Sequence, residues 1–191
     1  MSFRMTLLAT IGAVAAFAAS AQAATFNLAN SIGASTPLSI TAGGITATFS
    51  SASGPGTFSV ASTTGLFSFP VGLGDFASFS GDPLTITFSQ PVATPVSFRF
   101  GVEDAFGSGD TLTLTANTGQ TQAFGTSLNN LPFAEPEGSV NFVPSAAVTS
   151  LTITSANPFA IGDVNLPEPM SITLLGAGLV GLAATRRRRS N

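Results

Sequence analysis

The chain has 191 residues and a formal net charge of −3, and it contains no cysteine, histidine, tryptophan or tyrosine. These absences exclude disulfides, cysteine nucleophiles, histidine acid–base catalysis and zinc sites built from histidine and cysteine. Only 8% of the residues are charged and the mean hydropathy is +0.44. A globular domain has about 25% charged residues, so part of this chain is expected to lie outside such a domain.

The charge divides the chain into three segments. Residues 1–23 carry only Arg4, residues 24–166 carry one arginine against eight acidic residues (net −7), and residues 167–191 carry four arginines against Glu168 (net +3). We therefore predict three parts with different physical roles: 1–23, 24–166 and 167–191.

Residues 1–23 have the order of a secretory signal peptide. Arg4 precedes an uncharged run over 7–19, and the small residues Ala21 and Ala23 flank Gln22. A short apolar helix suits the translocon, and small side chains fit the peptidase pocket. We predict that signal peptidase cleaves after Ala23 and that the protein is exported through the inner membrane.

Residues 24–166 show the alternation of apolar residues with Thr or Ser that is typical of half-buried antiparallel strands. The clearest runs are 45–49, 84–88, 96–100, 112–115 and 151–154, and further candidates are 58–61, 66–69, 122–124, 140–142 and 159–164. Because the strands are short and separated by turn residues, we predict an all-β fold, an antiparallel two-sheet sandwich of jelly-roll type.

Candidate chemistry in this domain rests on carboxylates. Glu103, Asp104 and Asp110 lie in a glycine-rich loop and could bind Ca²⁺, which prefers oxygen ligands. The alternative is a solvated turn in which Asp and Gly fit the backbone geometry. Glu103 with Glu135 or Glu137 is a candidate pair for a secreted hydrolase. We predict no catalytic residue and no cofactor other than this Ca²⁺.

Aromatic and threonine side chains carry two further alternatives. All 17 aromatic residues are phenylalanine, which lacks the polar group that Tyr and Trp offer to sugars, so most are expected in the core. Thr111, Thr113 and Thr115 form a ladder like those on ice-binding faces. An ice-binding array needs such ladders on many adjacent strands, and outward-facing strand threonines explain this one better.

The C-terminal segment combines three elements in order. Pro167, Glu168 and Pro169 form an extended spacer, residues 170–185 are uncharged, and a basic tail ends the segment. The 16-residue run spans about 24 Å as a helix, somewhat short for a hydrocarbon core. We predict a single C-terminal transmembrane helix. The positive-inside rule places in the cytoplasm the four residues Arg186, Arg187, Arg188 and Arg189.

This segment resembles the PEP-CTERM sorting signal of exopolysaccharide-producing Gram-negative bacteria. The resemblance implies that an exosortase recognises Pro167, Glu168 and Pro169, cleaves nearby and transfers the exported domain from its temporary membrane anchor to the cell surface or matrix. Arg186–Arg189 would be the cytoplasmic stop. The same module is also labelled as the C-terminal domain of ice-binding proteins, a label that is not itself a sign of ice binding. A plain tail anchor is the alternative.

The strand order of the second half of the domain also resembles sandwiches of the carbohydrate-binding-module type. The runs that carry this likeness are 82–88, 98–100, 110–115 and 159–164. The sequence thus predicts a non-enzymatic surface or extracellular-matrix protein with a structural or adhesive role in envelope or biofilm. The alternatives are a carbohydrate-binding module, Ca²⁺-dependent or not, an ice-binding protein and a secreted hydrolase. Exopolysaccharide is a candidate partner, whereas a domain of charge −7 would be repelled by nucleic acid.

Overall fold

The computed structural model describes residues 23–76, 81–103, 110–128 and 135–167. Their secondary structure is almost entirely β, with one short 3₁₀ turn, η2 (Ala29–Ser31). Within these ranges no helix has the length and apolar character needed to cross a membrane. The predicted signal peptide, transmembrane helix and basic tail lie outside the described residues.

Six of the strands form an antiparallel sheet, here called sheet B, in the order β2-β3-β6-β12-β8-β9. Their bounds are β2 (Leu38–Ala42), β3 (Ile45–Ser51), β6 (Leu84–Val92), β8 (Thr111–Ala116), β9 (Thr121–Gly125) and β12 (Val148–Thr154). The alternating runs predicted at 45–49, 84–88, 112–115 and 151–154 are all confirmed as strands of this sheet.

Eight strands form the second antiparallel sheet, sheet A. They are β1 (Ala24–Phe26), β4 (Ser59–Ser62), β5 (Val71–Gly74), β7 (Val96–Val102), β10 (Ser127–Leu128), β11 (Pro136–Phe142), β13 (Phe159–Ile161) and β14 (Val164–Leu166). The central strand is β7, which pairs with β11 along one edge and with β13 and β14 along the other.

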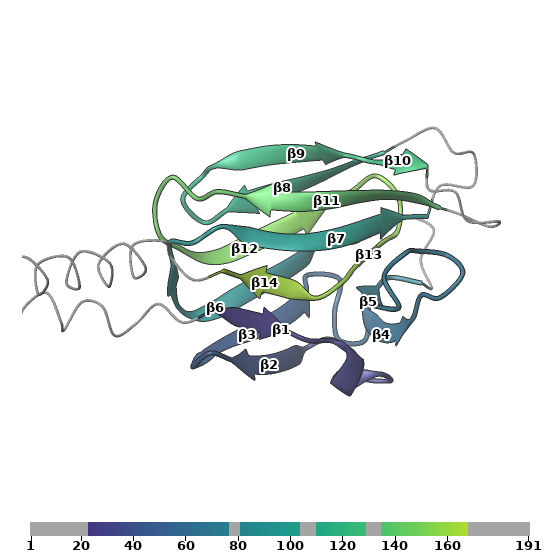
Figure 1. Ribbon diagram of the computed structural model, residues 1–191, viewed down its shortest axis with the longest axis horizontal. Helices are drawn as coiled ribbons and strands as arrows, with labels where there is room; N and C mark the ends of the chain where they lie inside the picture. The colour runs from purple at the N-terminus through teal and green to yellow at the C-terminus, as the bar shows by residue number, and fades with distance from the viewer. Residues whose placement is uncertain (1–22, 77–80, 104–109, 129–134, 168–191) are drawn as a thin grey trace, which may run out of the picture. The chain divides into compact units, whose positions relative to one another are not determined.

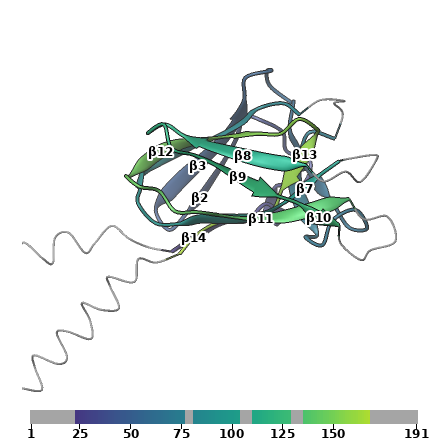
Figure 2. The same cartoon turned by 90° about the horizontal axis from the view of Figure 1, so that it is seen from above.

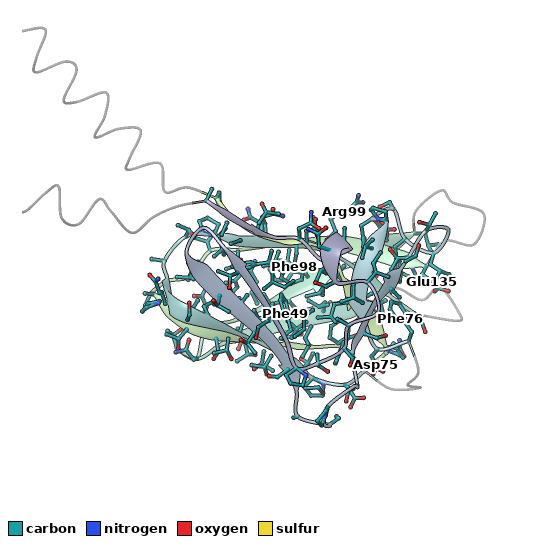
Figure 3. All side chains as sticks on the ribbon, turned by 90° about the horizontal axis from the view of Figure 1, so that it is seen from below. Phe49, Asp75, Phe76, Phe98, Arg99 and Glu135 are labelled. Atoms are coloured by element: carbon teal, nitrogen blue, oxygen red, sulfur yellow. The ribbon has the colours of Figure 1, made fainter. Side chains whose placement is uncertain are left out.

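Figure 1 labels strands of both sheets, and the view from above shows the two sheets face to face with the core between them (Figure 2). The predicted antiparallel sandwich is therefore confirmed. Phe98 of sheet A and Phe49 of sheet B both point into this space (Figure 3). Phe26 and Phe88 join the sheets directly, with ring centroids 6.2 Å apart. A fully buried phenylalanine contributes about 1.5–3 kcal/mol, so these rings are a main source of stability.

Two predicted strands differ from the structure. Residues 159–164 do not form one strand, because the chain is interrupted at Gly162 and Asp163 between β13 and β14. Residues 66–69 form a turn and a bend, with one isolated bridge between Thr64 and Phe67, rather than a strand. They belong to a loop, residues 63–70, that packs on the outer side of sheet A.

This 63–70 loop is held by two phenylalanines that cover small residues. The rings of Phe67 and Phe69 stack with centroids 5.2 Å apart, and both are buried together with Ala160. A Cβ atom on Gly101 would lie 2.1 Å from the Phe67 ring. Glycine at position 101 is therefore required for the loop to lie flat on β7.

Substituting Gly101 with alanine tests this packing. We expect Gly101→Ala to push Phe67 off the sheet and to lower the melting temperature by roughly 3–10 °C, the effect of overpacking by about 1–3 kcal/mol. Gly125→Ala is the matched control, because a Cβ atom there meets nothing within 4 Å. Thermal melts that show equal midpoints for the two variants would contradict the proposed packing.

Candidate functional site

A cavity of about 360 Å³ opens on the outer face of sheet A. Its polar side chains come from adjacent strands, because outward-facing residues at paired positions share one surface. Ser97 and Arg99 belong to β7, and Ser139 lies opposite Arg99 on β11. The rest of the lining comprises Ala29, Phe69, Pro70, Val71, Phe98, Val140, Asp163 and Asn165.

Arg99 is the single basic residue in the sequence between residues 24 and 166. Its side chain is 54% exposed, and one Nη2 atom lies 3.1 Å from Oε2 of Glu137. The other guanidinium N–H groups have no hydrogen-bond partner among the described residues. Arg99 therefore presents hydrogen-bond donors to the cavity.

Glu137 has a different, structural position. Its side chain is 6% exposed, and its carboxylate accepts hydrogen bonds from the backbone N–H and the hydroxyl of Ser68 in addition to the Arg99 pair. A buried carboxylate is costly unless it is paired and hydrogen-bonded. These bonds fasten the 63–70 loop to sheet A, and that loop supplies Phe69 and Pro70 to the cavity wall.

An irregularity between β13 and β14 brings Asp163 to the cavity. Ile161 of β13 pairs with Phe100, and Asn165 of β14 pairs with Ser97. The chain therefore advances by four residues from β13 to β14 while β7 advances by three. The extra residue is a β-bulge, a feature that redirects side chains next to binding sites. Asp163 Oδ1 accepts the N–H of Leu28 at 2.8 Å, and Oδ2 has no partner in the described part of the chain.

The cavity thus combines donors, acceptors and an apolar edge. Arg99 donates, Asp163 Oδ2 accepts, and the hydroxyls of Ser97 and Ser139 can do both. Ala29 and Pro70 supply the exposed part of the apolar wall. Such a surface suits a hydroxylated ligand, whose O–H groups need both partners and whose C–H face needs an apolar contact.

Three carboxylates gather away from this cavity. Burial raises the pKa of Glu103 above its ordinary value of 4.5, and the nearby charges of Glu135 and Asp75 raise it further. Figure 3 shows Asp75 and Glu135 at one end of the sandwich, with Arg99 on a different part of the surface. The structure therefore brings together the predicted pair Glu103 and Glu135, whereas Glu137 pairs with Arg99.

Only part of the predicted calcium site can be located. The Asp110 carboxylate accepts hydrogen bonds from Thr111 N–H (2.6 Å) and the Ser155 hydroxyl (2.8 Å), as a turn-stabilising aspartate does. Asp104 lies outside the described residues. In the described ranges no group of three or more carboxylates could hold a metal ion. The Ca²⁺ site at Glu103, Asp104 and Asp110 stays a prediction.

The predicted processing residues are mostly outside the described ranges. Ala23 and Pro167 are the terminal described residues, whereas Ala21, Glu168, Pro169 and Arg186–Arg189 are not described. Sequence reasoning missed the cavity around Arg99. The available signal was that residues 24–166 contain a single basic side chain, although its partners could not be named from the sequence.

No family model and no curated protein matches this sequence. Among solved structures, the chain is similar to the carbohydrate-binding module CsCBM6-3 of Clostridium stercorarium, in complex with cellobiose, at 14% identity and a TM-score of 0.38, covering 64% of this chain and 94% of that one. It is also similar to the CBM22-1–GH10 modules of the endo-1,4-β-D-xylanase 10B of Clostridium thermocellum, complexed with xylohexaose. That match has 15% identity and a TM-score of 0.34, covering 58% of this chain and 24% of the other. With TM-scores this low, neither likeness indicates a function.

The raised pKa of Glu103 predicts a dependence of stability on pH. Between pH 4.5 and its folded pKa, the folded state keeps a proton that the unfolded state has lost, so the free energy of unfolding falls as pH rises. Glu103→Gln removes this titration. We expect the variant to lose less stability than the wild type across that window and to be the more stable protein at pH 7.

Denaturant melts from pH 4 to pH 8 measure this difference. Glu135→Gln is the companion variant, and it should give a smaller gain because burial is the larger cause of the Glu103 shift. If the free energy of unfolding changed with pH in the same way for wild type and Glu103→Gln, the pKa of Glu103 would not be raised in the folded protein.

Proposed function

We propose that this chain is an exported, non-catalytic saccharide-binding protein of the bacterial surface, with the cavity around Arg99 as its binding site. The observation that carries the proposal is the placement of Arg99 donors and an Asp163 acceptor in one cavity, beside the apolar wall that Pro70 helps to form. A pair of sugar hydroxyls can bridge such groups while the sugar ring covers the apolar edge.

The charge of the domain favours a neutral saccharide. Residues 24–166 carry a net charge of −7, and a polyanion would be repelled by a surface with one arginine. Arg99 is also partly neutralised by Glu137. Hydrogen bonding to neutral hydroxyls requires no net positive charge.

Catalysis in the cavity is disfavoured by its carboxylate content. Glycoside hydrolysis needs two carboxyl groups across the scissile bond. Asp163 lines the cavity, Glu137 is buried against Ser68 and Arg99, and Glu103 and Glu135 do not line it. Binding without turnover is therefore the activity that the cavity supports best.

Filling the cavity tests the saccharide proposal. Ser139→Phe places a ring opposite Arg99, and we expect it to weaken binding at least about tenfold, which is about 1.4 kcal/mol. A glycan array with the domain Ala24–Pro167, which contains the whole described core, identifies the ligand, and calorimetry on the strongest hit measures the change.

Gln122→Phe is the control, because Gln122 is exposed on β9 of the other sheet and does not line the cavity. It should bind as the wild type does. Equal affinities for all three proteins would place the saccharide elsewhere, and an array without hits would remove the proposal.

The route to the surface belongs to the same proposal and rests on the sequence. A signal helix within 1–23 would start export, the helix at 170–185 would anchor the chain temporarily, and an exosortase would cleave near Pro167–Pro169. The arginines at 186–189 would stay in the cytoplasm. The domain would then retain neutral polysaccharide at the envelope or in the matrix as an adhesive component.

Substitution of the sorting motif tests this route. In the native Gram-negative host, we expect wild-type protein to reach the surface with a C-terminus near Pro167 and to lack the arginine tail. Glu168→Ala should remain in the inner membrane at full C-terminal mass, while Ser171→Ala, just outside the motif, should be processed normally. Cell fractionation with mass spectrometry measures both. The same compartment and mass for Glu168→Ala and wild type would rule out exosortase sorting.

A further inference from the structure

The outer face of sheet B is an array of hydroxyl side chains, here called the hydroxyl face. The strand register places Thr and Ser side by side on adjacent strands. One row crosses five strands, and two shorter rows lie beside it. The rows are Ser50-Thr85-Thr152-Thr115-Thr121, Ser39-Thr48-Thr87-Ser150 and Thr41-Thr46-Ser89. The threonine ladder at 111–115 is thus one of several on adjacent strands.

The hydroxyl face carries no charge. None of the six strands of sheet B contains an acidic or basic residue, although residues 24–166 carry nine charged side chains. Charged residues usually make up about 25–35% of a protein surface, where they support solubility. The domain as a whole is poor in charged residues, and on this face the described strands leave only neutral hydroxyl and methyl groups.

Eight of the twelve hydroxyl groups in these rows are restrained by hydrogen bonds to each other. Threonine is stiff at χ1, and its hydroxyls here bond across strands. The bonded pairs are Ser39–Thr48 (2.9 Å), Thr41–Thr46 (2.8 Å), Thr115–Thr121 (3.3 Å) and Thr85–Thr152 (3.4 Å). A hydroxyl that makes one such bond retains further hydrogen-bonding capacity. The result is a lattice with repeats of about 4.8 Å between strands and about 6.8 Å along them.

We propose that the hydroxyl face binds ice. Each water molecule in an ice surface donates and accepts hydrogen bonds at periodic positions, and a fixed hydroxyl lattice can do the same. The methyl groups of threonine fill the space between hydroxyls without competing for water. Charged side chains bring ions and hydration shells that an ice lattice cannot incorporate, so the lack of charge favours this occupant.

Two other occupants fit less well. The rows contain only Ser and Thr, and lack the aromatic, amide and charged groups that orient sugars. A second copy of the chain would bury too little. Six strands and three outward positions give roughly 600 Å², against about 800 Å² per partner in a stable interface.

Sheet twist limits the contact to the middle of the hydroxyl face. Neighbouring strands are rotated by about 20–25°, so a flat crystal plane cannot touch all six strands at once. The two longer rows run side by side across the central strands β6 and β12, which contribute Thr85, Thr87 and Thr152 to them. Thr41 on the edge strand β2 lies outside this contact.

Ice partition and ice recrystallisation assays on the domain Ala24–Pro167 test the proposal. Wild-type protein should enter slowly grown ice and suppress the growth of ice grains in annealed frozen sucrose. Thr152→Lys should abolish both effects by placing a charge at the centre of the face. Thr41→Lys adds the same charge at the edge and should keep them. Thr87→Lys repeats the central test at an exposed side chain if Thr152→Lys fails to fold.

Several outcomes would overturn the proposal. Wild-type protein that is excluded from ice, or central lysine variants that partition like wild type, would do so. Loss of binding to an insoluble neutral polysaccharide in Thr152→Lys, with no ice partition by wild type, would assign the face to a sugar. Ser139→Phe should leave ice partition unchanged, because the Arg99 cavity lies on the opposite sheet. Failure of the saccharide proposal and failure of the ice proposal are thereby distinguishable.

Discussion

Alternation of apolar and hydroxyl side chains along β2, β3, β6, β8 and most of β12 is the constraint on which the rest of this structure depends. In β6, Leu84, Ile86 and Phe88 point into the core while Thr85 and Thr87 point out. A register slip of one residue would expose the phenylalanine and bury the threonines, so the pairing is tightly specified. The same alternation that builds a dry core therefore also builds an ordered hydroxyl surface on the other side.

Sheet A departs from this alternation, and the cavity lies beside the region of departure. Gly101 and Ala160 leave the outer surface shallow, so Phe67 and Phe69 can cover it from the 63–70 loop. Glu137 then secures the loop through Ser68 and Arg99. The buried carboxylate requires these partners, and this requirement fixes the guanidinium beside the cavity.

The sandwich could be predicted because its signal is local, whereas the cavity could not. A run such as Leu84–Phe88 contains its own period, and the five clearest runs all became strands. Residues 66–69 show the same alternation but cover a sheet from outside, and nothing in their sequence reports which side of the sheet they occupy. The cavity brings Arg99 and Ser139 together through the pairing of β7 with β11. It brings in Asp163 through the bulge between β13 and β14, which both pair with β7. Such long-range pairing leaves no periodic trace in the sequence.

Charge placement links the two faces and the end of the sandwich. Because sheet B carries no charged residue, the acidic residues in the described part of the domain lie in loops and in sheet A. Part of this concentration is visible where Glu135 and Asp75 raise the pKa of Glu103. Repulsion between these carboxylates favours the protonated form of Glu103. One face is thereby left neutral and periodic, and the other holds a single arginine in a cavity. The two proposed sites would therefore lie on opposite sheets, and occupation of one would leave the other accessible.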